Sequence, residues 1–531
     1  MIQISQLKLP VSHTEAQLLH KIEKVLHVRS TDITEWKILK KSIDARDKSR
    51  LLFVYTIGVR LSSEKTERSI LIRGGKNHVS AYSAPEYHFP ETGSRELSAP
   101  PVIVGSGPAG LFCAWELAMH GYRPVLLERG ESASQRWNAV ERFWNTGELD
   151  PDSNVQFGEG GAGTFSDGKL NTGVNNPRIH WILEQFVKAG AGEDILFDAK
   201  PHVGTEVLVE VVQSIRRRIE EMGGEVRFRT RVTGIKQTGD RITAITTQTG
   251  EEIPCTRVIL AIGHSARDTF RMLEEMGVPM EPKPFAMGAR IEHLQKNIDL
   301  AQYGGENPAL PPADYKLAEH LEDGTVYTFC MCPGGYVVAA ASEEGGVVTN
   351  GMSNSDRGGE NANAALLVTV RPGDFPYPGP LGGMLWQREI EERAYRTAGD
   401  YRAPAQTVGD FLAGKPSTGP AEVKPTYRPG VVWCDLNTVL PESITASLKQ
   451  ALPRLETRLH GFADPNAVLT APETRSSSPV RILRGEDRQS KLRGLYPAGE
   501  GAGYAGGIMS AAIDGMLCAE KILEEIREEI Q

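Results

Sequence analysis

The chain has 531 residues, more than one hydrophobic core usually organises, so its length predicts several domains. A hydrophobic share of 40% and a charged share of 24% are typical of a globular protein, and the net charge of −9 argues against general nucleic-acid binding. The six cysteines match neither a disulfide framework nor a CxxC zinc site, so we expect no metal and a reducing, cytoplasmic environment. Because we find no leader-like start and no apolar run of about twenty residues, we also expect no membrane span.

Residues 1–76 predict a small α/β unit that differs from the rest of the chain in charge. Segments 2–10 and 50–61 have the pattern of strands, and residues 14–28 have that of a helix with one apolar side. The unit has a net charge of +7, against −16 for the remainder. Its clustered basic residues are Lys37, Lys40, Lys41, Arg46, Lys48 and Arg50. The unit resembles a ferredoxin-like module that could dock a protein partner, RNA or another subunit, although a solvated charged face is the default interpretation.

A linker rich in Pro, Ser and Glu follows at 83–101, and the pattern then becomes that of a dinucleotide-binding unit. An apolar strand at 102–105 leads into a GxGxxG turn and a helix that reaches residue 119. The first glycine of such a turn permits the tight bend, the second lets a pyrophosphate approach, and the third lets helix and strand pack closely. Glu128, after the next strand, is placed to bind the adenosine ribose and would repel a 2′-phosphate. The residues expected to contact the cofactor here are Gly105, Gly107, Pro108, Ala109, Gly110, Glu128 and Arg129.

Three distant regions also have the pattern of ligand-facing loops. Residues 157–173 contain six glycines, a density expected where a ligand lies against the backbone, with a mobile surface loop as the alternative. Regions 256–269 and 494–515 each place a turn of small residues after an apolar strand. A nicotinamide dehydrogenase would complete its second mononucleotide half sooner. A long, folded-back ligand that contacts all these regions fits FAD better than NAD.

Three motifs together carry a family resemblance: VIVGSGPAGLFCAWELA (102–118), GEGGAGTFSDGKLNTG (158–173) and GYAGGIMSAAIDG (503–515). The chain resembles the glutathione-reductase-type flavoproteins and, more closely, a bacterial family of FAD-dependent dehydrogenases. The resemblance implies non-covalent FAD, with the ribityl chain at Glu500, where Asp is usual, and the adenine at the backbone of Val232. It places the flavin N1–O2 edge at a helix start and directs Lys169 and Asn171 toward the ring. The further contacts it implies are Gly160, Gly161, Gly163, Thr164, Ser166, Val232, Ala261, Gly263, Gly499, Glu500, Gly507, Ile508 and Met509.

The candidate catalytic residues are Lys169, Cys330, Cys332 and Arg290. Because hydride transfer belongs to the flavin, the protein needs only to position substrate and exclude water, and we predict no nucleophile triad. Strand alternation would put Cys330 and Cys332 on one face, where they could form a redox-active thiol pair. Packing against the flavin is the commoner role of buried cysteine.

Clustered arginines are the second kind of candidate. Arg290 lies near Glu292 and His293, and three arginines follow in one short stretch: Arg475, Arg481 and Arg484. Such clusters bind carboxylates or phosphates bidentately, but salt bridges between domains would leave the same residues. His202 and His264 could donate protons, although a structural histidine with satisfied hydrogen bonds is the commoner case.

These patterns together predict an α/β fold. We expect a discontinuous Rossmann-like FAD-binding domain (99–274 and 485–531), an inserted mixed α+β substrate domain (275–484), and an N-terminal ferredoxin-like α+β domain with its linker (1–95). The predicted function is an FAD-dependent oxidoreductase that transfers a hydride between flavin and a small substrate, for which an anion is one option. No second GxGxxG follows a strand, so NAD(P)H would act as a transient reductant. The alternatives are a flavin-dependent tRNA modification enzyme and a flavin electron carrier for a protein or quinone partner.

Overall fold

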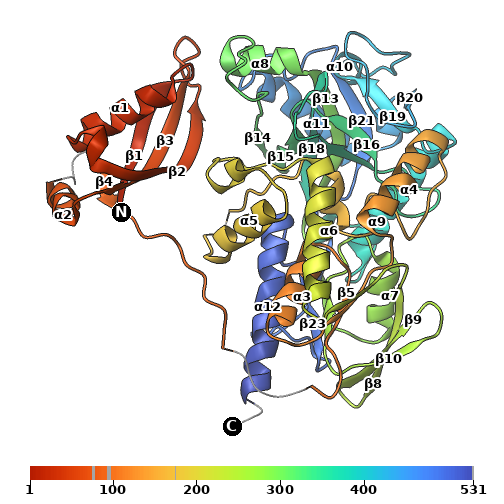
Figure 1. The fold of residues 1–531 in the computed structure, drawn as a ribbon. Helices are drawn as coiled ribbons and strands as arrows, with labels where there is room; N and C mark the ends of the chain where they lie inside the picture. The colour runs from red at the N-terminus through yellow and green to blue at the C-terminus, as the bar shows by residue number, and fades with distance from the viewer. Residues whose placement is uncertain (74–77, 92–96, 174, 529–531) are drawn as a thin grey trace.

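The computed structural model describes residues 1–531 except 74–77, 92–96, 174 and 529–531, so residues 92–96 of the predicted linker lie outside the description. Figure 1 shows a small N-terminal unit beside a larger body, joined by the extended chain after β4. In the described part of the chain, no helix is long and apolar enough to cross a membrane.

The N-terminal unit is a four-stranded antiparallel sheet in the order β2-β3-β1-β4. Its elements are β1 (Ile2–Pro10), α1 (Glu15–Leu26), β2 (Ile33–Asp44), β3 (Leu52–Leu61), α2 (Glu64–Arg73) and β4 (Val79–Ala81). The predicted helix is confirmed as α1, which Thr14 caps by accepting from the Gln17 N–H. The edge strand β2 was not predicted, because it is half-buried along most of its length and carries little alternation.

The edge strand β2 also pairs with the main body. The Lys41 N–H donates to the Phe197 carbonyl at 2.8 Å, and the Ala199 N–H donates to the Lys41 carbonyl at 2.8 Å. Lys41 and Asp198 thus form a parallel bridge. A strand edge that would otherwise expose unpaired N–H and C=O groups is therefore partly covered by this chain's own residues.

The main body contains a five-stranded parallel sheet in the order β23-β11-β5-β6-β7. Its strands are β5 (Val102–Val104), β6 (Val125–Leu127), β7 (Glu225–Arg227), β11 (Val258–Leu260) and β23 (Leu495–Pro497). Alternate residues face opposite layers: Ile103 packs with α3 (Pro108–Met119), α6 (Thr205–Glu221) and α12 (Ile508–Glu528), whereas Val102 packs toward the small sheet described next. The parallel order brings the carboxyl ends of the strands to one edge, where a dinucleotide binds in such folds.

The small sheet β10-β9-β8 covers the second face of the parallel sheet. Its strands are β8 (Val232–Thr238), β9 (Arg241–Thr247) and β10 (Glu252–Pro254). The other helices of this part are α4 (Ala133–Thr146), α5 (Arg178–Lys188) and α7 (Arg267–Glu275).

A seven-stranded mixed sheet lies above the parallel sheet in Figure 1, in the order β14-β15-β18-β13-β21-β19-β20. Its strands are β13 (Phe285–Leu294), β14 (Ala318–Leu321), β15 (Gly324–Cys332), β18 (Asn361–Val370), β19 (Ala403–Thr407), β20 (Val431–Trp433) and β21 (Val468–Glu473). On β13, Met287, Ala289 and Ile291 pack with α11 (Glu442–Glu456), so the alternate residues, including Arg290, face the opposite side.

Shorter elements complete the body. Two strand pairs, β12 (Met280–Pro282) with β22 (Val480–Ile482) and β16 (Tyr336–Ala339) with β17 (Thr349–Met352), are antiparallel. The remaining helices are α8 (Gln295–Tyr303), α9 (Gly382–Ala398) and α10 (Val408–Ala413).

Candidate functional site

The three glycines of the GxGxxG turn have different surroundings. Gly105 has a φ of +100°, and a Cβ added there would overlap the Ala261 carbonyl, while one at Gly110 would overlap the Gly105 carbonyl. A Cβ at Gly107 would meet its nearest atom, the Gly161 Cα, only at 3.9 Å. The fold itself thus requires the first and third glycines. The second borders open space at the start of α3, as expected where a pyrophosphate approaches.

The glycine-rich loop lies directly against this turn. The Gly160 N–H donates to the Ser106 carbonyl at 2.9 Å, and a Cβ on Gly161 would lie 3.0 Å from the Gly107 Cα. At its other end, a Cβ on Gly163 would lie 3.0 Å from the Ile508 side chain at the start of α12. The loop therefore connects the start of α3 to the start of α12.

Arg136 on α4 holds this loop in place through hydrogen bonds. It was not among the residues selected from the sequence. Its fully buried guanidinium donates to loop carbonyls that include Asn154 at 2.8 Å and Glu159 at 2.8 Å. Burial lowers the pKa of Arg136 to about 9, although the carboxylates of Glu128 and Glu159 raise it. The glycines thus belong to an ordered structure, which argues against the alternative of a mobile surface loop.

Glu128 joins the two segments through its buried carboxylate. One oxygen accepts from the Ser106 N–H at 2.9 Å and hydroxyl at 2.7 Å, and the other from the N–H groups of Gly130 at 2.9 Å and Gly158 at 3.0 Å. A ribose would therefore add its hydroxyls to a carboxylate that four protein donors already orient. The neighbouring Arg129 pairs with Asp268 at 2.9 Å.

The two distant turns meet beside the GxGxxG turn. A Cβ on Gly501 would overlap the Gly263 carbonyl, and the Gly499 N–H donates to Asp514 at 2.8 Å. The Glu500 carboxylate lies 3.6 Å from Nδ1 of His264. Among the described residues, the buried Nε2 of His264 has no hydrogen-bond partner. Four segments that are distant in the sequence therefore converge at one sheet edge, and their residues fit a bound dinucleotide.

The remaining predicted cofactor contacts have mixed positions. The Thr164 hydroxyl donates to the Glu159 carbonyl at 3.2 Å, and the Ser166 hydroxyl to the Gly163 carbonyl at 2.6 Å, so both stabilise the loop itself. Val232 begins β8 in the apolar layer, and Met509 is buried in α12. Gly507, just before α12, has a φ of +149°.

A charged cluster lies where the glycine-rich loop ends. Asp167, with a fully buried side chain, lies 3.1 Å from Nζ of Lys169 and accepts from Arg357 at 2.9 Å and from the Ser353 hydroxyl. Burial would raise the pKa of Asp167, but Lys169, Arg357 and His202 lower it overall. The sequence analysis selected Lys169 but missed Asp167 and Arg357, although both lie in segments rich in glycine, serine and asparagine.

The two candidate cysteines lie beside this cluster. Lys169 donates to the Met331 carbonyl, between Cys330 and Cys332. A register shift in β15 between Phe329 and Cys332 and a φ of +43° at Cys330 interrupt the regular alternation on which the predicted thiol pair was based, but the two cysteine side chains still lie next to each other. The Cys332 thiol donates to the Cys330 carbonyl at 3.2 Å. Its hydrogen bond to the Cys330 sulfur, followed by the charges of Lys169 and Arg290, lowers the pKa of the Cys330 thiol.

Arg290 reaches the same cysteine from β13 but is completely buried. It donates to Glu473 at 2.7 and 3.0 Å, to Asn363 at 2.9 Å and to the Cys330 carbonyl at 3.0 Å. Its donors are thus used within the protein, and it positions the backbone at Cys330. Nearby, Glu292 accepts from Thr426, and His293 contacts the Phe462 carbonyl at 2.7 Å.

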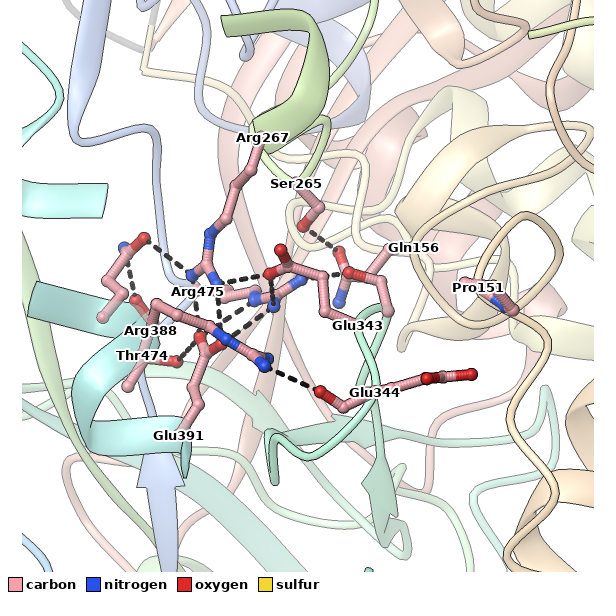
Figure 2. A network of polar contacts seen from close by, with 12 residues as sticks. Pro151, Gln156, Ser265, Arg267, Glu343, Glu344, Arg388, Glu391, Thr474 and Arg475 are labelled. Atoms are coloured by element: carbon pink, nitrogen blue, oxygen red, sulfur yellow. Dashed lines mark hydrogen bonds and ion pairs between the residues drawn. The ribbon is translucent and has the colours of Figure 1, made fainter. Parts of the chain in front are cut away.

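The arginines of the 475–484 stretch form internal ion pairs. Figure 2 shows Arg475 and Arg267 converging on Glu391, with Glu343 beside them. Glu391 accepts from Arg267 at 2.8 and 2.9 Å and from Arg475 at 2.9 and 3.0 Å. The other two pairs are Arg481 with Glu281 at 3.3 Å and Arg484 with Asp514 at 2.7 Å. These contacts support the interpretation of structural salt bridges rather than substrate binding.

Comparison with protein families matches four regions of the chain. They are an FAD-dependent protein, C-terminal domain-like family (284–476), an NAD(P)-binding Rossmann-like domain (103–158), a pyridine nucleotide-disulphide oxidoreductase domain (179–286) and a domain of unknown function (1–60). A protein of Clostridium beijerinckii with no assigned function is 44% identical over 531 residues, which is 99% of each chain.

Solved flavoprotein structures show weak similarity. The flavin-dependent brominase Bmp2 has a TM-score of 0.37 at 13% identity, covering 81% of this chain and 79% of its own. A variant of halogenase PltM in complex with FAD has a TM-score of 0.39 at 11% identity, covering 81% and 70%. Glycine oxidase from Bacillus cereus has a TM-score of 0.30 at 14% identity, covering 81% and 95%.

Proposed function

Because this chain belongs to the same family of FAD-dependent flavoproteins as the Clostridium beijerinckii protein, we propose that it is an oxidoreductase acting on a small substrate beside Lys169 and Cys330. The observation that carries the proposal is the continuity of one loop. Its glycines lie at the sheet edge where the four segments converge. Its end supplies Asp167 and Lys169 to the charged cluster beside Cys330 and Cys332. A substrate held at this cluster would therefore lie next to the cofactor site.

The cofactor is FAD, which supplies hydride chemistry when bound. Gly107, Gly161 and the N–H groups at the start of α3 would hold its pyrophosphate, and Glu128 its ribose. Glu500 and the start of α12 would hold the ribityl and ring portions. We assign these roles because the four segments converge there and because Gly107 borders space that the protein does not fill.

The protein side of the proposed reaction is electrostatic. Although burial lowers the pKa of Lys169, the Asp167 carboxylate and the two thiols raise it, so the ammonium stays charged at neutral pH. Lys169 would orient an anionic substrate, and the sulfur of Cys330 would hold or accept a proton, assisted by the Cys332 thiol. Arg290 is a positioning residue, because it acts through the Cys330 carbonyl.

The N-terminal unit supports the ferredoxin-like interpretation. Its β-α-β-β-α-β element order and the strand order β2-β3-β1-β4 are those of a split βαβ module. We propose that its basic surface contacts a protein partner, with Lys37, Lys40 and Arg46 exposed. An anaerobic titration distinguishes electron transfer to such a partner from electron transfer to a small molecule.

An anaerobic titration of the purified yellow protein tests the proposal. NADH, NADPH and small reduced anions are added separately while the visible flavin absorbance is followed. We expect at least one small molecule to reduce the flavin, and Lys169→Met to slow that reduction without loss of bound FAD. The matched control is Lys188→Met, since Lys188 is exposed on α5. A flavin that no small molecule reduces or reoxidises would contradict the proposal and favour an electron carrier.

A further inference from the structure

Arg357 has an unusual backbone conformation and lies beside the turn at 333–335 that follows the two cysteines. Its φ of +49° lies in the left-handed region, which few residues other than glycine adopt. A Cβ on Gly334, just after the cysteines, would overlap the Arg357 carbonyl, and the Gly359 N–H donates to the Gly334 carbonyl at 2.9 Å. The turn at 333–335 and the segment 354–359 thus hold Arg357 in a conformation that costs energy, a feature that is common at functional sites.

Two cations share one carboxylate at this point. The Arg357 guanidinium donates to Oδ2 of Asp167 at 2.9 Å, and Lys169 lies 3.1 Å from the same oxygen. The side chain of Asp167 is fully buried, whereas those of Arg357 and Lys169 are 12% and 28% exposed. The cluster therefore carries excess positive charge on the side that solvent can reach. A small anion would compensate this excess.

His202 also lies at this cluster. Its Nδ1 lies 2.8 Å from the Asp167 carbonyl, and its Nε2 lies 3.2 Å from the Ser355 carbonyl. The Asp167 carboxylate is thus surrounded by the Lys169 ammonium, the Arg357 guanidinium and the Ser353 hydroxyl, which is a neutral donor.

Arg357 also has an unused donor. Among the described residues, its Nε is buried and has no hydrogen-bond partner, and a buried donor without a partner is unfavourable. By contrast, Arg290, Arg475 and Arg484 each donate bidentately to a buried carboxylate. The guanidinium fork matches a carboxylate that takes two parallel N–H donors.

We propose that Arg357 and Lys169 form a binding site for a carboxylate group, located beside the thiol of Cys330. The site adjoins the turn that follows Cys330, because Lys169 donates to the carbonyl of the next residue, Met331, and Gly334 contacts Arg357. Taking this carboxylate as part of the enzyme's substrate rests on the proposed function; the site itself does not. The carboxylate site would restrict substrates to small carboxylic acids whose reacting carbon lies near Cys330 when the carboxylate is bound.

Alkylation of Cys330 provides a test that is independent of flavin reduction. The FAD-loaded protein is treated with iodoacetate or iodoacetamide, which differ in having a carboxylate or a neutral amide. In both reactions the sulfur of Cys330 forms a bond to the reagent CH₂ carbon and iodide leaves with the electron pair. Peptide mass spectrometry locates the modified cysteine. Half-buried Cys434 serves as an internal reference.

We expect the rate ratio of iodoacetate to iodoacetamide at Cys330 to exceed that of free cysteine by about tenfold, the effect of one charge-assisted hydrogen bond. Arg357→Gln should reduce the ratio toward that of free cysteine, and Arg357→Lys should retain part of it. Arg454→Gln, at an exposed arginine that pairs with Glu319, should leave it unchanged. An unchanged ratio in Arg357→Gln, or no alkylation of Cys330 by either reagent, would overturn the proposal.

Protection of the unmodified protein supplies a second readout, which does not depend on a variant folding. Acetate should slow iodoacetate at Cys330 more than chloride does at equal ionic strength. Inorganic phosphate that protects better than acetate would overturn the carboxylate assignment in favour of a phosphate site. If the ratio and the protection are as expected while no small molecule reduces the flavin, the anion site stands and the proposed function fails.

Discussion

Gly107 and Gly161 face each other across the candidate cofactor site: a Cβ on Gly161 would lie 3.0 Å from the Gly107 Cα, and one on Gly107 would have 3.9 Å of clearance. The protein itself therefore leaves room for a methyl group at Gly107. A pyrophosphate bound at the start of α3 would clash with that methyl group. A substitution at Gly107 therefore tests cofactor binding separately from folding.

Gly107→Ala should keep the stability of the apoprotein and lose bound FAD. Its Cβ meets no atom closer than 3.9 Å, but it occupies the approach to the helix N-terminus. FAD per chain after purification, and the urea midpoint of the apoprotein, check both parts. Gly110→Ala should instead lower the midpoint, because its Cβ would overlap the Gly105 carbonyl. Full FAD content in Gly107→Ala would place the pyrophosphate elsewhere.

Asp167→Asn should destabilise the protein by about 3–5 kcal/mol, because it leaves Lys169 and Arg357 without their shared charge partner. Urea unfolding measures the loss, and Asp356→Asn, at an exposed neighbour, is the matched control. The folded-state pKa of Asp167 is lowered, so its contribution is complete above the ordinary Asp pKa of about 4 and declines as pH falls below it. Equal midpoints for the two variants would show that the cluster contributes no net stability.

Glu391→Gln should destabilise the junction between α7 and α9 by about 3–5 kcal/mol. The fully buried Glu391 is the shared acceptor of Arg267 and Arg475, and Glu343 would be the one carboxylate left to both arginines among their ion pairs in the described residues. Although burial raises the pKa of Glu391, the two arginines lower it well below its ordinary range, so this stability also declines as pH falls below about 4.

The matched control for Glu391→Gln is Glu392→Gln. Glu392 is the next residue on α9 and pairs with Arg388 at the surface at 2.7 Å, an interaction worth about 0–1 kcal/mol. Thermal and urea midpoints of the two variants should therefore differ clearly. A similar loss in both would mean that the network in Figure 2 behaves like a surface salt bridge.

Cys330 should react with iodoacetamide at lower pH than an ordinary thiol. The hydrogen bond from Cys332 and the charge of Lys169 lower its pKa, whereas burial raises the pKa of Cys434 to about 11. The pH–rate profile at each cysteine, followed by mass spectrometry, should show Cys330 reaching its plateau first. Lys169→Met should move the Cys330 profile to higher pH and leave Cys434 unchanged. Coincident profiles in the unmodified protein would contradict the predicted thiolate.

The dinucleotide turn was predictable because its signals are local. A strand, three glycines at fixed spacing and a helix are read within a few residues, and the structure has β5 and α3 there. The strand β2 was not predictable, since an edge strand that is half-buried along most of its length has little alternation. The register shift near Cys330 was also not predictable, because it depends on pairing with β18.

The amino-acid sequence was enough to predict a Rossmann-like unit and a glycine-rich loop for FAD, because both follow from backbone requirements of short segments. Which charged side chains meet depends instead on long-range packing. Arg290, Arg475 and Arg484 found internal carboxylates, while Arg357 came to lie beside Lys169 over Asp167 with a donor unused. Residues that are tens to hundreds of positions apart become neighbours only through packing, and burial, which makes an unpaired donor costly, does not exist in the extended chain.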